Sequence, residues 1–113
     1  MTTTVSFAAQ LHPEQMPEVA SRGFRSVINN RPDFEHGPDQ PPSAALEEAA
    51  RNAGLSYVFQ PVISGAISQF DVETFARHFQ ELPKPVLMFC RSGARSNNLY
   101  QMAVQLGLVD TAD

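Results

Sequence analysis

Hydrophobic positions follow two spacings along the chain, and these spacings predict strands and helices in alternation. Short apolar or β-branched runs predict strands at residues 5–9, 24–28, 55–62 and 86–89. Between and after these runs, apolar residues recur at helical spacing, which predicts helices at residues 12–22, 43–52, 68–82 and 96–106. The alternation predicts an α/β fold, with a mainly parallel sheet of four to five strands flanked by helices.

Several helix boundaries carry residues that are typical of helix ends. Ser43 is suited to cap the second predicted helix. Ser68 and Asp71 have the spacing of a capping box at the start of the third. The phenylalanines in and beside that helix are predicted to belong to the core, namely Phe70, Phe75 and Phe79.

Length and charge narrow the classes of protein that the chain can represent. With 113 residues it is predicted to form a single domain over residues 1–113. Its formal net charge of -4 argues against nucleic acid or an anionic membrane surface as the main partner. No apolar run approaches the roughly 20 residues that a membrane span needs, and the first residues do not resemble a signal peptide.

Cysteine and histidine usage completes this first picture. A single cysteine cannot form an intramolecular disulfide, so we expect a reducing, cytoplasmic location. The three histidines, His12, His36 and His78, are scattered and have no second cysteine near them. We therefore expect no metal site and no cofactor.

Two segments are expected to meet at the carboxyl edge of the sheet, where parallel α/β sheets bind ligands. The first is the polar, proline-rich loop of residues 29–42. In it, Arg31 is predicted to line an anion site, Asp33 to orient an arginine or act as an acid, and Asn30 to support them. The alternative is that these residues only form a turn.

The second segment follows the apolar run Val86–Phe89 and reads CRSGARS from Cys90 to Ser96. A short loop that contains glycine can turn successive backbone N–H groups inward and bind an anion, and the next helix adds its N-terminal dipole. We expect the residues of this loop to bind a substrate anion, namely Arg91, Ser92, Gly93, Ala94, Arg95 and Ser96.

The same surroundings indicate a role for Cys90. A thiol at a helix N-terminus beside arginines has its pKa lowered from about 8.5 to roughly 3.5–7.5, which makes it a thiolate nucleophile near neutral pH. A cysteine after an apolar strand can also be a small buried hydrophobe. Two arginines, a glycine and a serine within six positions favour the nucleophile, with Arg95 as its catalytic partner.

These residues carry a resemblance to known families. CRSGARS is similar to the active-site loop of rhodanese-type sulfurtransferases. The wider chain resembles the beta-lactamase-hydrolase-like, or phosphatase-like, domain family, through NNRPD at residues 29–33 and CRSGARS at this spacing. The resemblance implies a fold like that of dual-specificity phosphatases. It also implies an association with persulfide dioxygenases of the metallo-beta-lactamase fold, and hence with sulfide detoxification.

The resemblance is compatible with two reactions, phosphate hydrolysis and sulfur transfer. Cysteine phosphatases place five residues between the cysteine and the arginine, whereas Arg95 follows Cys90 after four. They also use an acid on a separate loop, and residues 63–68 contain none. We therefore expect a sulfurtransferase that moves sulfane sulfur from thiosulfate or a persulfide through a Cys90 persulfide.

Two alternatives stay open beside this expectation. The first is a phosphatase that acts through a phosphocysteine on Cys90. The second is a non-catalytic module that binds an anion or a partner. The expected partners are a small sulfur-containing or phosphate anion and, from the resemblance, a persulfide dioxygenase-like domain.

Overall fold

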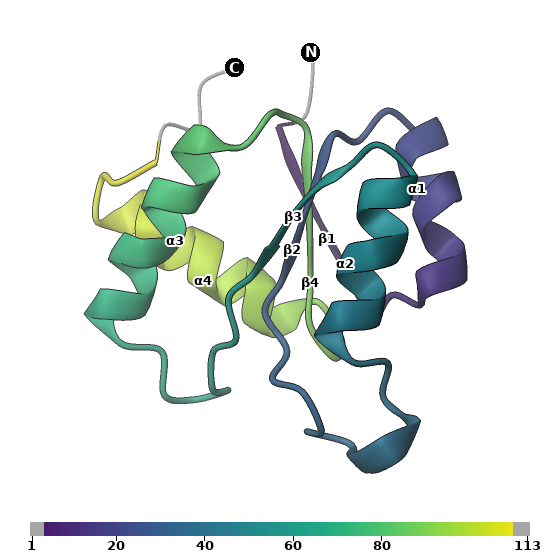
Figure 1. Ribbon diagram of the computed structural model, residues 1–113. Coiled ribbons are helices and arrows are strands. Elements are labelled where there is room, and N and C mark those ends of the chain that lie inside the picture. The colour runs from purple at the N-terminus through teal and green to yellow at the C-terminus, as the bar shows by residue number, and fades with distance from the viewer. Residues whose placement is uncertain (1–3, 110–113) are drawn as a thin grey trace.

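A computed structural model describes residues 4–109 as an α/β fold around one parallel sheet (Figure 1). Its four strands are β1 (Val5–Ala8), β2 (Ser26–Asn29), β3 (Ser56–Phe59) and β4 (Val86–Phe89). They are ordered β1-β4-β2-β3, and every neighbouring pair is parallel. The predicted fold class is confirmed, and the sheet of the described residues has four strands where four to five were expected.

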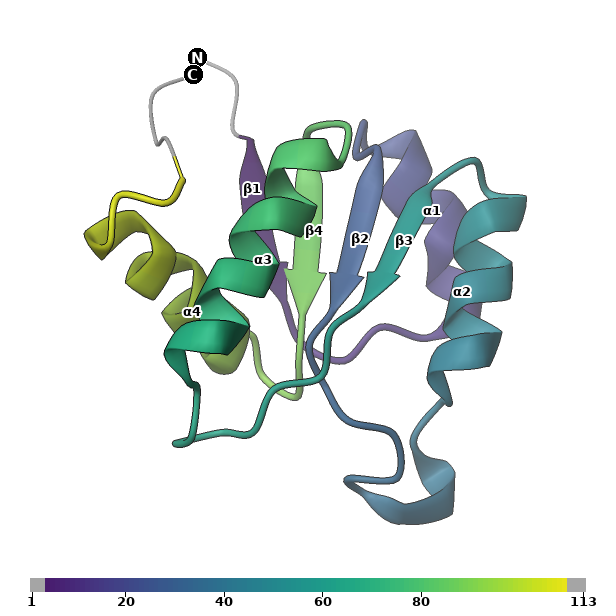
Figure 2. The ribbon, with the colours of Figure 1, turned by 60° about the vertical axis from the view of Figure 1, so that its left-hand side comes forward.

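Helices cover both faces of this sheet. The helical elements are η1 (Pro13–Gln15), α1 (Met16–Ser21), η2 (Gly37–Asp39), α2 (Ser43–Asn52), α3 (Gln69–Glu81) and α4 (Ala94–Gln105). Figures 1 and 2 show α1 and α2 on one face and α3 and α4 on the other. No helix within residues 4–109 is long and apolar enough to cross a bilayer.

The two central strands, β2 and β4, are buried at every position and divide the core into two halves. Because side chains alternate across a strand, Leu87 and Phe89 face α1 and α2, whereas Val86 and Met88 face α3 and α4. This two-sided burial explains why β4 is apolar at every position of its sequence.

Two expectations about helix α3 and helix α2 differ from the structure. Phe70 is 71% exposed and does not belong to the core, whereas Phe75 and Phe79 do. The reason is helical geometry, since Phe70 lies about 140° around the helix from Phe75.

The expected role of Ser43 as a helix cap also differs from the structure. Ser43 is the first residue of α2 rather than its cap, and its backbone N–H donates to Asp33 Oδ1 at 2.8 Å.

All four strands point in one direction, so their carboxyl ends lie at one edge of the sheet, at the bottom of Figure 2. The loops that follow β2, β3 and β4 start there. Asn30 links them, because its N–H donates to Phe89 O at 2.9 Å and its carbonyl accepts from Val62 N at 3.0 Å.

Candidate active site

The loop between β4 and α4 wraps closely around Cys90. Gly93 immediately precedes α4 with φ of 99°, a left-handed conformation that glycine adopts readily and other residues do not. This turn brings the backbone N–H of Gly93 to 3.1 Å from Cys90 Sγ. A Cβ atom on Gly93 would lie 3.4 Å from the backbone oxygen of Ala8 on β1, so the loop also lies tightly against its neighbour.

The surroundings of Cys90 favour the thiolate. Only 1% of the residue is exposed, and burial raises the pKa of its thiol. Backbone N–H groups of Ser96, Gly93 and Ser92 and the Ser96 side chain act in the opposite direction and prevail, so the thiol pKa is lowered. The predicted anion-binding loop therefore surrounds the sulfur with hydrogen-bond donors.

Arg95 is a buried cation beside this loop, with 9% of the residue exposed. One terminal nitrogen, Nη1, donates to Val62 O at 3.0 Å, and the other, Nη2, donates to Glu35 Oε1 at 3.0 Å. The third nitrogen, Nε, is buried and has no hydrogen-bond partner within residues 4–109. A buried donor without a partner is costly, and an oxyanion at this position would satisfy it.

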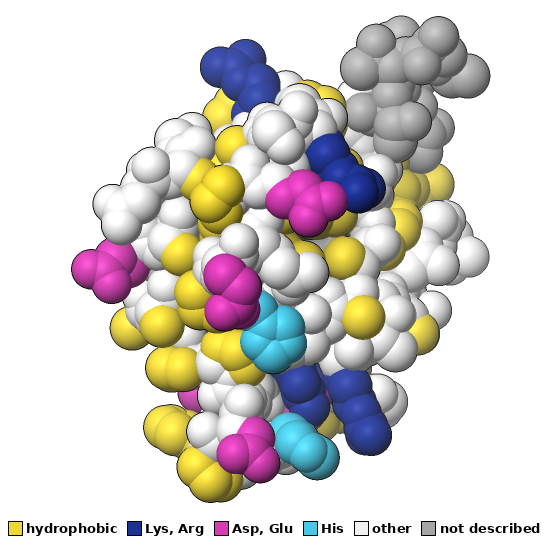
Figure 3. Space-filling view, turned by 90° about the vertical axis from the view of Figure 1, so that its right-hand side faces the viewer, with side chains coloured by type: hydrophobic (Ala, Val, Ile, Leu, Met, Phe, Trp, Pro, Cys, Tyr) yellow, Lys and Arg dark blue, Asp and Glu magenta, His cyan; other side chains and the backbone are white. Residues whose placement is uncertain are grey.

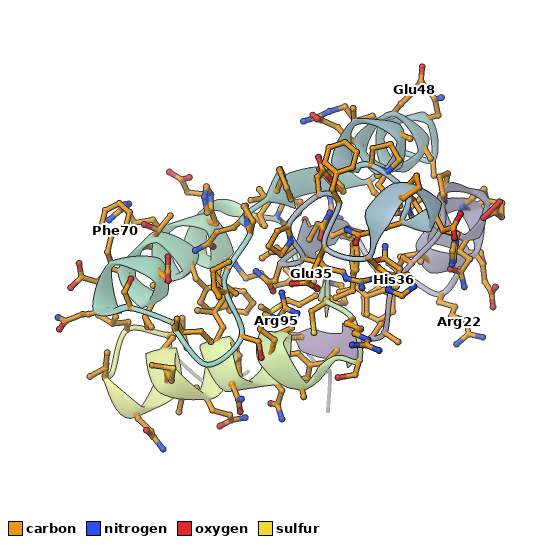
Figure 4. The ribbon with its side chains drawn as sticks, turned by 90° about the horizontal axis from the view of Figure 1, so that it is seen from below. Arg22, Glu35, His36, Glu48, Phe70 and Arg95 are labelled. Atoms are coloured by element: carbon orange, nitrogen blue, oxygen red, sulfur yellow. The ribbon has the colours of Figure 1, made fainter. Side chains whose placement is uncertain are left out.

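Glu35 joins Arg95 to a second buried arginine. Its Oε1 also accepts from Arg31 Nε at 2.8 Å, and Arg31 Nη1 donates to Gln10 Oε1 at 2.9 Å. The hydrogen bond from Arg95 is the main cause that lowers the pKa of Glu35, ahead of the opposing effect of burial and the bond from Arg31. Figure 4 shows Glu35 and Arg95 side by side near the centre of this end of the molecule, with Phe70 far to one side.

These residues surround a cavity of about 350 Å³ with Cys90 in its wall. Three arginines contribute to the lining, which gives the cavity a positive character in a chain that is acidic as a whole. Figure 3 shows basic, acidic and histidine side chains close together at the lower end of one face. The full lining is Arg31, Glu35, His36, Ser64, Cys90, Arg91, Ser92, Ala94 and Arg95.

Asn30 and Ser96 form the buried support of the cavity. Ser96 Oγ donates to Asn30 Oδ1 at 2.8 Å, and Asn30 Nδ2 donates to Gln60 O at 2.9 Å. Both residues are fully buried. Together they connect α4 to the ends of β2 and β3, so the positions of the Cys90–Arg95 loop and the 29–42 loop are coupled.

The structure brings most of the residues singled out in the sequence to one place. Arg31 and the Cys90–Arg95 loop line or shape the cavity, and Asn30 and Ser96 lie beneath it. Asp33 lies elsewhere and engages the start of α2 through Ser43. Within residues 4–109, no group of three His, Cys, Asp or Glu side chains could hold a metal ion.

Sequence reasoning missed Glu35, His36 and Ser64 as lining residues. Glu35 and His36 belong to the same 29–42 loop as Arg31, which was predicted to line the site. The spacing of four residues between Arg31 and the acidic Glu35 was a sequence feature that could have indicated an ion pair. Ser64 carries no signal in the sequence, because only the path of the β3–α3 loop brings it to the cavity.

Comparison with known proteins finds phosphatase-like relatives of the chain. Residues 1–107 match a family model described as beta-lactamase hydrolase-like protein, phosphatase-like domain. A beta-lactamase hydrolase-like protein of Xylella fastidiosa is 39% identical over 99 residues, which cover 88% of this chain and 23% of that protein. The chain thus spans about a quarter of the length of that relative.

Solved structures agree with the family model. A "putative phosphatase" from Neisseria meningitidis has a TM-score of 0.85 and 29% identity, over 96% of this chain and 77% of that one. Kinase associated phosphatase, solved with its catalytic site cysteine replaced by serine, has a TM-score of 0.69. Its 14% identity over 96% of this chain and 67% of that one makes this a likeness of fold alone.

The expectation of a sulfurtransferase is wrong, because the family model and the structural neighbours are phosphatase-like. The two arguments behind it were the short spacing to Arg95 and the lack of an acid in residues 63–68. In the structure, Arg95 lines the same cavity as Cys90 despite the short spacing. His36, a side chain that can carry a proton, reaches the cavity from a different loop.

Proposed function

The chain belongs to the phosphatase-like domain family of beta-lactamase hydrolase-like proteins, and from this premise we propose that it is a cysteine-dependent phosphatase. Its substrates are phosphate monoesters. The observation that supports the proposal most strongly is the pairing of Cys90, whose thiol pKa is lowered, with Arg95, whose buried Nε has no partner among the described residues. Nucleophile and oxyanion donor line one cavity.

The reaction has two steps in this site. In the first, Cys90 Sγ attacks phosphorus, the S–P bond forms, and the P–O bond to the leaving group breaks. In the second, water attacks phosphorus, the S–P bond breaks, and phosphate leaves together with a regenerated thiolate. The inward-facing N–H groups of the loop and the Arg95 guanidinium stabilise the negative charge on the phosphoryl oxygens in both steps.

The leaving oxygen needs a proton unless it departs as a stable anion. The β3–α3 loop, residues 60–68, contains no aspartate, glutamate or histidine. Glu35 lines the cavity but its pKa is lowered, which makes it a poor proton donor. His36 lines the same cavity, and histidine is the side chain best suited to donate a proton near neutral pH, so we assign the donation to His36.

The partner that follows from this proposal is a small or protein-borne phosphate monoester. The expectation of a persulfide dioxygenase-like partner domain stays a prediction, to be tested on the full-length protein.

The test is hydrolysis of p-nitrophenyl phosphate by the reduced protein. Cys90→Ser is expected to abolish turnover, and Arg95→Lys to lower kcat/KM by about 10²-fold or more, because the buried guanidinium stabilises the transition state. Arg51→Lys is the matched control, since Arg51 lies on the exposed surface of α2 and turnover should not change. Acid quenching during turnover should trap one phosphoryl group on Cys90.

Two outcomes would contradict the proposal. Hydrolysis that persists in Cys90→Ser would exclude a phosphocysteine intermediate. Phosphate binding without turnover on any aryl or alkyl phosphate tried would assign the domain to the non-catalytic anion-binding class.

A further inference from the structure

Glu35 places a carboxylate at the rim of a cavity whose other charged side chains include three arginines. It lies among Arg31, Arg91 and Arg95, which line the cavity with it. A ligand oxyanion and the Glu35 carboxylate have charges of the same sign and compete for the same donors. The carboxylate side chain is 29% exposed, so it lies at the rim and can move outward.

The competition centres on one edge of the Arg95 guanidinium. An arginine binds an oxyanion bidentately through two neighbouring N–H groups, and Nε and Nη2 form such an edge. In Arg95 the Nε has no partner in the part of the chain that the structure describes, whereas Nη2 donates to Glu35 Oε1 at 3.0 Å. Phosphate bound through Nε and Nη2 therefore shares Nη2 with Glu35, and its oxygens lie beside a carboxylate of the same charge.

Neither arginine depends on Glu35 for its position. Arg95 Nη1 is fixed by Val62 O at 3.0 Å, and Arg31 Nη1 is fixed by Gln10 Oε1 at 2.9 Å. Each guanidinium keeps a second anchor when Glu35 is neutralised. The main contribution of Glu35 to the cavity is therefore its charge.

The loop that carries Glu35 is held in an unusual conformation. The preceding residue, Phe34, has φ of 63°, in the left-handed region that a phenylalanine rarely adopts. Asp33 is bonded to Ser43 N, and Phe34 O accepts from Gly37 N at 3.1 Å. Such strain clusters at functional sites, and here it accompanies the turn that directs Glu35 to the arginines.

We propose that Glu35 is an affinity-determining residue, an internal counter-anion that occupies Arg95 and weakens the binding of phosphate. A substrate phosphoryl group displaces it from Nη2, and its return favours release of the product phosphate. The inference rests on the proposed function only in taking phosphate as the ligand.

The test measures binding of inorganic phosphate by calorimetry and by protection of Cys90 from iodoacetamide, both without turnover. Removing the like charge in Glu35→Gln is expected to tighten phosphate binding about tenfold. Glu35→Ala, which leaves no amide to bond the arginines, is expected to shift affinity in the same direction. Glu47→Gln makes the same change in net charge on the exposed surface of α2 and should leave the affinity unchanged.

Unchanged or weaker phosphate binding in a folded Glu35→Gln protein would overturn the inference, because a residue that only positions the arginines gives that result. Tightening that is equal in Glu47→Gln would also overturn it, since the effect would then come from net charge. Tighter binding in a protein that hydrolyses no phosphate monoester would support the inference while the proposed function fails. If the wild type hydrolyses phosphate monoesters and Glu35→Gln binds phosphate with unchanged affinity, the proposed function stands and only the inference about Glu35 fails.

Discussion

The backbone N–H of Gly93 lies 3.1 Å from Cys90 Sγ, and this contact depends on the left-handed turn at Gly93. The glycine thus connects the conformation of the loop to the ionisation of the thiol. The donated hydrogen bond stabilises the thiolate over the thiol and is one of the causes that lower the pKa of Cys90.

Replacing Gly93 with alanine should therefore raise the pKa of Cys90 and destabilise the fold. The new Cβ would lie 3.4 Å from Ala8 O, and φ near 99° is strained for alanine, at a cost of about 1–2 kcal/mol. The pH dependence of Cys90 alkylation by iodoacetamide measures the first effect, and urea unfolding measures the second. The midpoint of alkylation should move to higher pH.

Gly54→Ala is the matched control for this prediction. Gly54 has φ of 84° and an added Cβ would meet nothing within 4 Å, so the variant shares the backbone strain without the contact at Cys90. Its alkylation profile should match the wild type. An unchanged profile in Gly93→Ala would show that the glycine N–H contributes little to the thiolate.

Regular elements were largely predictable from the sequence, whereas loop geometry was not. The apolar run of β4 and the helical spacing of Val72, Phe75 and Phe79 are local patterns, and both elements lie where these patterns place them. The prediction for Phe70 was wrong because it used hydrophobicity alone, whereas helical spacing puts Phe70 on a different side of α3 from Phe75 and Phe79. Cys90 was identifiable because its glycine and arginines are neighbours in sequence.

Contacts across long sequence separations could not be derived from spacing. Glu35 and Arg95 are 60 residues apart, and their ion pair depends on the path of a proline-rich loop without periodic pattern. The bond between Asp33 and Ser43 depends on the same path, so the sequence could not distinguish a structural Asp33 from a catalytic one. The choice between sulfur and phosphate was wrong for a related reason, since a residue count does not give the position of a guanidinium.

Asp33→Ala should lower stability and leave catalysis nearly unchanged. Asp33 Oδ1 accepts the first backbone N–H of α2 from Ser43 at 2.8 Å, and loss of such a cap costs about 1 kcal/mol. Urea unfolding should show this loss, while kcat/KM for p-nitrophenyl phosphate stays within about threefold, as expected for a residue outside the reacting groups. Asp39→Ala, an exposed change in the same loop, is the control. A fall in kcat/KM of about 10²-fold would instead make Asp33 an acid catalyst.

Glu35 should make stability depend on pH in the acidic range. Its pKa is lowered from an ordinary value of 4.5, mainly by the hydrogen bond from Arg95. Because the folded state binds the proton more weakly than the unfolded state, the stabilising effect of the carboxylate is complete above pH 4.5 and is lost as the pH falls through the lowered pKa. The difference in free energy of unfolding between wild type and Glu35→Gln should shrink below pH 4.5. A difference that stays constant there would contradict the ion pair.

The role assigned to His36 predicts an effect that depends on the leaving group. A proton donor matters most when the departing oxygen is strongly basic, and general acid catalysis contributes about 10²–10⁴-fold. His36→Gln should therefore lower kcat/KM for phenyl phosphate by at least about 10²-fold, and by much less for p-nitrophenyl phosphate, whose leaving group needs little help. His78→Gln, on α3 and outside the lining of the cavity, should change neither rate. Equal losses on both substrates would indicate that His36 shapes the cavity without donating the proton.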